Sequence, residues 1–96
     1  MCTMIVEKAE ISGTGKGPHG WFTLREANVS YDHPFHAPLE HALNIDFVNE
    51  AEGLDARVAV ELSAESARTL VQAILAALAR AEQGGHLVET ASVGAR

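Results

Sequence analysis

Three of the five histidines in this 96-residue chain lie within nine positions of one proline-containing segment, YDHPFHAPLEH. They are His33, His36 and His41, and the acidic residues Asp32 and Glu40 are adjacent to the first and the last of them. Imidazole nitrogens and carboxylate oxygens bind borderline transition ions such as zinc, iron, nickel, copper and manganese. Three protein ligands with one open coordination position are typical of a catalytic metal.

We therefore predict a divalent transition-metal site whose ligands are His33, His36 and His41, completed by Glu40, Asp32 or Cys2. The spacing H-x2-H-x3-E-H matches no standard metal signature. It differs from the H-E-x-x-H of metalloproteases, which needs both histidines on one helical face, because Pro34 and Pro38 oppose a regular helix here.

Two metal-free interpretations of the same residues stay open. His41 beside Glu40 could be a general base toward a small organic substrate, since imidazole titrates near neutral pH. Alternatively, the imidazoles only shape a loop in a binding or interaction module. The catalytic candidates are thus His41 and Glu40, and the sequence does not decide whether the protein is an enzyme.

The hydrophobic pattern predicts four strands and one helix. The strands are expected at residues 3–11, 21–31, 42–49 and 56–62, and the helix from Ser63 as N-cap to about Glu82. The first strand should end where SGTGKGPHG begins, because its glycines and proline interrupt regular structure. A β-bulge is expected near Ala27 and Asn28, where the apolar phase of the second strand changes.

The resulting architecture is α+β: a four-stranded antiparallel sheet in the order β-β-β-β-α, with one C-terminal amphipathic helix packed on one face. Residues 1–83 form one domain, and residues 84–96 form a tail that we expect to be flexible. His41 shares the strand parity of Leu43 and Ile45, so its ring is expected at the mouth of the space between sheet and helix. We expect a homodimer, because a single helix leaves part of the sheet uncovered.

Composition excludes several functions. The formal net charge is −6 and the seven basic residues are scattered, so nucleic-acid binding is not expected. The longest apolar run is too short to cross a bilayer, and the N-terminus does not read as a secretory signal. We therefore predict a cytoplasmic protein with a small-molecule ligand as its partner and no membrane contact. The literal G-x-G-x-x-G match, GKGPHG, precedes a strand rather than a helix, so it is no dinucleotide site.

Three stretches, GKGPHGWFTL, YDHPFHAPLEHALNIDFVN and ARVAVELSAESARTLVQAIL, resemble an uncharacterised family of small bacterial proteins catalogued as a domain of unknown function. The resemblance covers most of residues 1–80. It implies a short stand-alone bacterial protein and brings no activity with it.

Overall fold

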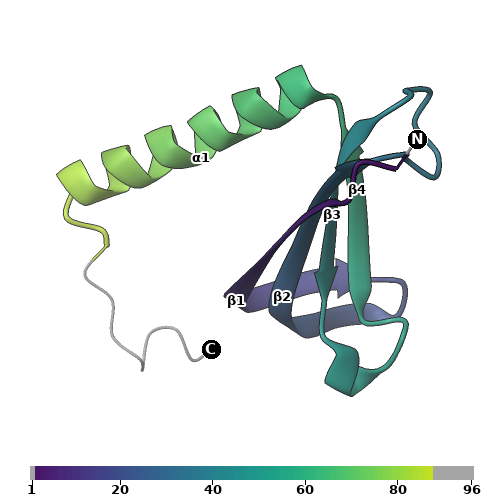
Figure 1. Cartoon of the computed structure of the whole chain (residues 1–96). Helices are drawn as coiled ribbons and strands as arrows, with labels where there is room; N and C mark the ends of the chain where they lie inside the picture. The colour runs from purple at the N-terminus through teal and green to yellow at the C-terminus, as the bar shows by residue number, and fades with distance from the viewer. Residues whose placement is uncertain (1, 88–96) are drawn as a thin grey trace. The chain divides into compact units, whose positions relative to one another are not determined.

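The computed structural model describes residues 2–87 and contains a four-stranded antiparallel sheet followed by one helix (Figure 1). The elements are β1 (Ile5–Gly17), β2 (Gly20–Asp32), β3 (Ala42–Val48), the 3-10 turn η1 (Glu50–Glu52), β4 (Arg57–Leu62) and α1 (Ala64–Gln83). The strands pair in chain order, so the sheet is a meander. The predicted α+β class and element order are confirmed.

The chain divides into two compact units, a sheet unit that ends at Ala64 and a helix unit that begins at Glu65. Each unit is a body of its own. The packing of the helix on the sheet and the single domain over 1–83 therefore stay predictions. Most of the predicted flexible tail, residues 88–96, lies outside the described residues.

The ladder gives the sheet one apolar and one polar face. Val29 pairs with Ile45, which pairs with Val60, and these positions share a face. The next step of the same ladder aligns Ser30, Asn44 and Glu61 on the opposite face. The clean alternation of β3 and β4 is what made their hairpin predictable from the sequence.

The predicted end of the first strand at residue 11 is wrong, because β1 continues through the glycine stretch to Gly17. The glycines are compatible with a strand here because large side chains of β2 fill the space beside them. A Cβ atom on Gly15 would lie 3.1 Å from Leu24 Cδ2, and one on Gly17 would lie 3.1 Å from Phe22 Cε1. Glycine at these two positions thus makes room for cross-strand apolar side chains.

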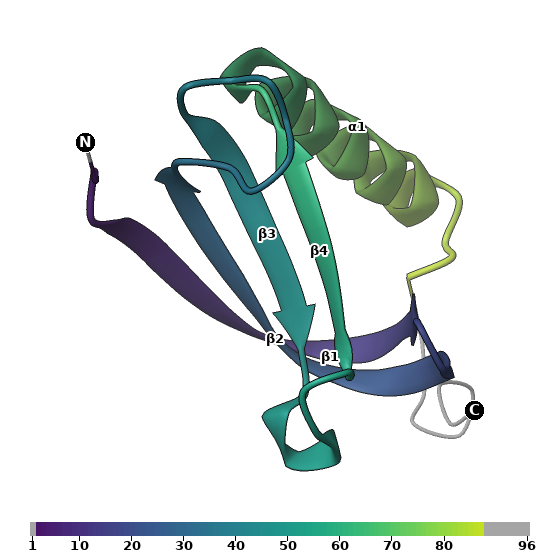
Figure 2. The same ribbon diagram turned by 90° about the vertical axis from the view of Figure 1, so that its right-hand side faces the viewer.

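The predicted bulge near Ala27 and Asn28 is also wrong in position. Ala27 pairs with Ala9 in an unbroken ladder, and the register shifts between Glu10 and Gly13 of β1 instead. The extra residue is in β1. The apolar side chains of β2 therefore change sides relative to β1 here, while β2 itself stays a continuous strand. Beyond this irregularity the hairpin of β1 and β2 bends and crosses the lower end of the sheet (Figure 2). Its turn reaches the start of β4, where His19 Nε2 lies 3.0 Å from Asp55 Oδ2.

The helix has the predicted extent and a defined C-terminal cap. Gly85, with φ of 76°, adopts the left-handed conformation that favours glycine. The N–H groups of Gly85 and His86 donate to the carbonyls of Glu82 and Ala81 at 3.0 and 2.8 Å, which is the Schellman pattern. Among residues 2–87, no helix combines the length and apolar character needed to cross a bilayer.

Candidate metal site

The candidate site lies at the base of the loop that joins β2 to β3. The last ladder pair between these strands is Asp32 with Ala42. One step further along the same register, His33 enters the loop and His41 leaves it, so the two histidines occupy facing positions. Their rings stack with centroids 5.0 Å apart and planes inclined by 24°. The strand register therefore brings together two side chains that are eight residues apart in sequence.

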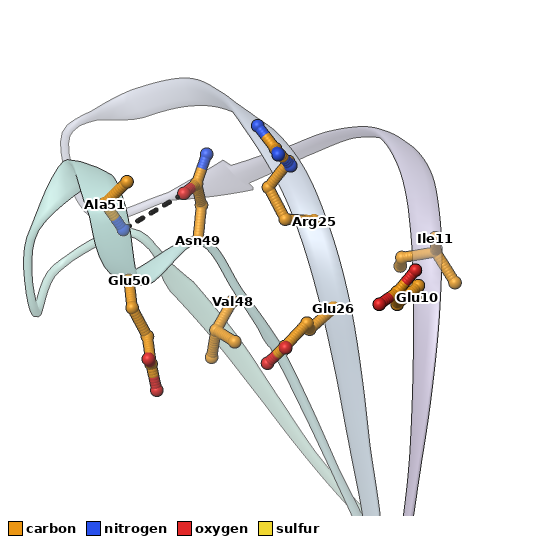
Figure 3. Close-up of a pocket in the computed structure, with 8 residues that line it drawn as sticks. All are labelled: Glu10, Ile11, Arg25, Glu26, Val48, Asn49, Glu50 and Ala51. Atoms are coloured by element: carbon orange, nitrogen blue, oxygen red, sulfur yellow. Dashed lines mark hydrogen bonds between the residues drawn. The ribbon is translucent and has the colours of Figure 1, made fainter.

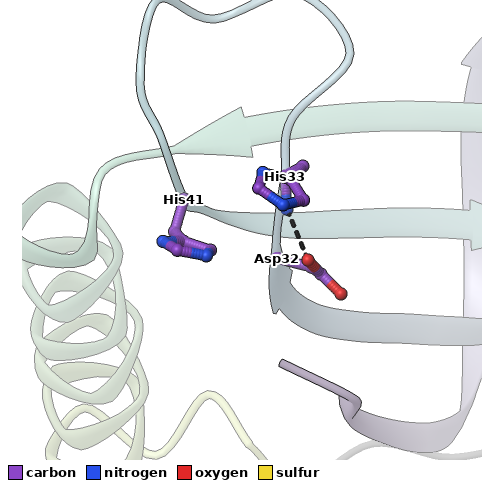
Figure 4. Close-up of side chains that lie close together, drawn as sticks. All are labelled: Asp32, His33 and His41. Carbon is purple, nitrogen blue, oxygen red and sulfur yellow. Dashed lines mark hydrogen bonds between the residues drawn. The ribbon is translucent and has the colours of Figure 1, made fainter. Parts of the chain in front are cut away.

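Asp32 joins the two histidines to form a group of potential metal ligands. One ligand atom from each of Asp32, His33 and His41 lies within 4.8 Å of the other two (Figure 4). Asp32 and His41 are half-buried, whereas His33 is exposed. Two imidazoles and one carboxylate form a donor set that suits divalent transition ions.

Neighbouring groups orient both imidazoles. His33 Nδ1 lies 3.0 Å from the backbone carbonyl oxygen of Glu40. Because a carbonyl only accepts, this contact requires the proton on Nδ1 and leaves the lone pair on Nε2. The other ring, His41, stacks on Tyr31 with centroids 5.9 Å apart.

The Asp32 carboxylate is held ionised by donors from the N-terminal segment and the loop. Cys2 Sγ lies 3.1 Å from Oδ2, the His33 N–H donates to Oδ1 at 2.8 Å, and the Thr3 N–H reaches Oδ2 at 3.3 Å. The Cys2 contact is the largest cause that lowers the pKa of Asp32 below its ordinary value, and the two N–H groups add to it against desolvation. An ionised carboxylate is the form that binds a cation.

Glu61 of β4 holds the loop from the polar face. Its carboxylate accepts the backbone N–H groups of Phe35 at 2.6 Å, His36 at 3.1 Å and Ala37 at 2.7 Å. The Ala37 bond is the largest cause that lowers the pKa of Glu61, with smaller contributions from the other two bonds against desolvation. One side chain thus fixes three consecutive residues in the middle of the loop.

The geometry differs from the predicted ligand set in one respect, since Asp32 rather than His36 completes the group. His36 lies at the middle of the loop, where its backbone N–H binds Glu61. Glu40 contacts His33 through its backbone carbonyl, and its side chain is exposed. Cys2 lies next to Asp32 but outside the group of three. The sequence contains no local signal for the part played by Glu61, because its partners are 24–26 positions away.

A separate hollow of about 360 Å³ lies beside the β-bulge (Figure 3). Its wall carries three carboxylates and one guanidinium: Glu10, Glu26, Glu50 and Arg25. The buried Asn49 within it is already engaged, because its Nδ2 donates to the Thr23 carbonyl at 3.0 Å and its Oδ1 accepts the Ala51 N–H at 3.1 Å. These hydrogen bonds fix the turn after β3, and they occupy the Asn49 amide.

Comparison with known families agrees with the resemblance noted in the sequence. A family of unknown function, DUF6295, matches residues 1–87. The chain belongs to this family. No curated protein and no solved structure matches the chain. The family match therefore covers the sheet, the histidine loop and the helix, and brings no activity with it.

Proposed function

We propose that this protein binds a divalent transition-metal ion through Asp32, His33 and His41. The observation that carries the proposal is the approach of three ligand atoms to within 4.8 Å of one another at one end of the sheet. Bonds from nitrogen and oxygen ligands to such ions are about 2.0–2.2 Å long, so ligand atoms at the 4.8 Å limit must move closer together to share one ion. Zinc, iron, nickel, copper and manganese all suit this donor set.

The surroundings of the ligands support the same proposal. Metal-binding histidines usually donate their second ring N–H to a carbonyl or carboxylate, and His33 Nδ1 has the Glu40 carbonyl for this purpose. Asp32 is held ionised by its neighbours. An ion with three protein ligands keeps positions for water or a small organic substrate, so a metalloenzyme is the natural extension of the proposal.

The test uses untagged protein. Metal content after purification is measured by mass spectrometry, and zinc is titrated calorimetrically into protein stripped with EDTA. Asp32→Asn, His33→Ala and His41→Ala should each weaken zinc binding at least about tenfold, since even the loss of a group that only orients a ligand costs about 10–100-fold. His19→Ala, at the opposite end of the sheet unit, is the matched control and should bind zinc like the wild type.

His36→Ala distinguishes the two ligand sets. The proposal expects it to retain most of the zinc affinity, whereas the set predicted from the sequence, His33, His36 and His41, expects a loss as large as that of His41→Ala. Zinc binding that survives Asp32→Asn, His33→Ala and His41→Ala as well as His36→Ala would reject the site. No zinc binding by the wild type would also reject it. A metal-free general base or binding module would then be the remaining interpretation, with any activity unchanged by chelators.

The homodimer is a separate proposal with its own measurement. Light scattering on the eluting protein should give twice the 10.2 kDa of one chain. A mass equal to one chain at micromolar concentration would reject it.

A further inference from the structure

The polar face of the sheet carries a hollow whose lining shares Asp32 and His33 with the candidate metal site. It has a volume of about 360 Å³, within the range of small-molecule sites, and residues of all four strands and the histidine loop line it. Asn28, Ser30 and Asn44 are among the residues from the two central strands. Asp32 and His33 lie at one end, so a molecule in the hollow would be next to the candidate metal ligands.

The lining includes the apolar side chains of Val6, Ile45 and Val60, and its polar groups are mainly hydrogen-bond acceptors. Asn44 Nδ2 faces the carbonyls of Asp32 and Ala42 at 3.3 and 3.2 Å, so its Oδ1 points away from them. Among the described residues, nothing donates to Oδ1 of Asn44 or to Oδ1 of Asn28, and both atoms are buried. A buried acceptor without a partner costs free energy, and a donor from a ligand would recover it once a turn of the Asn side chain exposes the atom to the hollow.

The charges of the wall oppose an anion. Three carboxylates, those of Asp32, Asp46 and Glu61, line the hollow, against the one guanidinium of Arg57. Arg57 is engaged with Asp46, because its Nε and Nη2 lie 3.0 and 2.8 Å from Asp46 Oδ1. A neutral or cationic molecule that carries N–H groups fits this wall better than a phosphate or a dicarboxylate.

The hollow is formed before any ligand binds. The Glu61 carboxylate fixes the backbone of Phe35, and the Phe35 ring, which is fully exposed, forms part of the rim. Ala59 of β4 lies on the lining and leaves the space open because its side chain is a single methyl group. A preformed site loses less conformational entropy on binding.

We propose that this hollow binds a small organic amine, whose N–H groups donate to the acceptors of the wall. The inference does not depend on a bound metal. It is tested on EDTA-stripped protein with three probes of equal length: the diamine putrescine, the corresponding butane diol, and the dicarboxylate succinate. Each is titrated into ¹⁵N-labelled protein at physiological ionic strength, where the Debye length of about 8 Å suppresses diffuse attraction to the acidic surface.

Putrescine should bind with a Kd of about 1 mM or tighter, which suits a ligand of this size. The side-chain amide signals of Asn28 and Asn44 should shift, and the diol should bind more weakly and succinate least. Ala59→Phe, which fills the hollow, should weaken putrescine binding at least tenfold, and Ala59→Leu repeats the test with a smaller side chain. Ala51→Phe, an equal change at an exposed site outside the hollow, should leave binding unchanged.

Equal shifts with all three probes, tighter binding of succinate, or putrescine binding that survives both Ala59 variants would overturn the proposal. Because metal is absent throughout, these results are independent of the zinc titrations. A protein that binds zinc but no putrescine would retain the first proposal and lose this one, and the reverse result would do the opposite.

Discussion

His33 and His41 occupy facing positions one step beyond the last β2–β3 ladder pair, and their ring centroids lie 5.0 Å apart. The relationship follows from the register of two strands and does not depend on the conformation of the loop between them. It places two imidazoles at a fixed point of the sheet, beside a carboxylate that is held ionised. The account of the site depends on this pair.

The two ring nitrogens of His33 have separable functions. In His33→Asn, the side-chain amide can still donate to the Glu40 carbonyl, but no nitrogen occupies the Nε2 position. We expect this variant to retain the melting temperature of the wild type and to lose zinc affinity about 10–100-fold. His33→Ala should lose both. Thermal melts and calorimetric titrations of the two variants provide the comparison, and full zinc affinity in His33→Asn would assign the metal to other groups.

Glu61 should order the middle of the histidine loop. Glu61→Ala removes the acceptor of three backbone N–H groups, so the amides of Phe35, His36 and Ala37 should exchange hydrogen about tenfold faster or more. Hydrogen exchange followed by NMR measures this directly. Glu7→Ala, at an exposed position of β1, is the control and should leave these three amides unaffected. Unchanged exchange in Glu61→Ala would show that the loop is held by other contacts.

The lowered pKa of Glu61 predicts a specific pH dependence of stability. A carboxyl group whose pKa is lower in the folded state stabilises that state when ionised. Its contribution is complete above the unfolded pKa of about 4.3 and is lost as the pH falls through the lower folded value. The difference in melting temperature between wild type and Glu61→Gln should therefore be largest near neutral pH and disappear in acid. Asp32 titrates in both proteins with the same sign and cancels from the difference. A difference that grows in acid would have the wrong sign.

The glycines of β1 should differ sharply in their tolerance of a side chain. Gly15→Val puts a Cβ 3.1 Å from Leu24 Cδ2, so overpacking should cost about 1–3 kcal/mol in the free energy of unfolding. A Cβ on Gly13, in the same strand, meets nothing within 4 Å, so Gly13→Val should change stability little. Denaturant unfolding of both variants measures the costs. Equal costs would contradict the close approach of Leu24.

Local patterning was sufficient for most of the fold. Alternation marked β3 and β4, and the apolar periodicity with Gly84 and Gly85 marked α1. The same reasoning failed at Gly15 and Gly17, because a glycine-rich stretch reads as a break unless the cross-strand partners are known. The neighbours that matter are Leu24 for Gly15 and Phe22 for Gly17, each diagonal to its glycine across the β1–β2 ladder, and only the register identifies them.

The candidate site was likewise predictable only where local sequence was enough. The histidine-rich loop was visible in the sequence, and so was the candidacy of His33 and His41. The choice between Asp32 and His36 as the third member was not, because it depends on which residues are at the base of the loop and which are at its tip. Glu61 reads as an ordinary polar-face residue of a strand, and its hold on the loop is a tertiary contact without a local pattern.

The most direct test of the metal proposal is a histidine-selective ¹⁵N NMR spectrum of the EDTA-stripped protein before and after one equivalent of zinc. Coordination changes the shift of the bound ring nitrogen, so each of the five imidazoles reports on itself. The account predicts changes at His33, on Nε2, and at His41, with His19, His36 and His86 unmoved. Unchanged signals for His33 and His41, or a coordinated His36 in place of either, would contradict it.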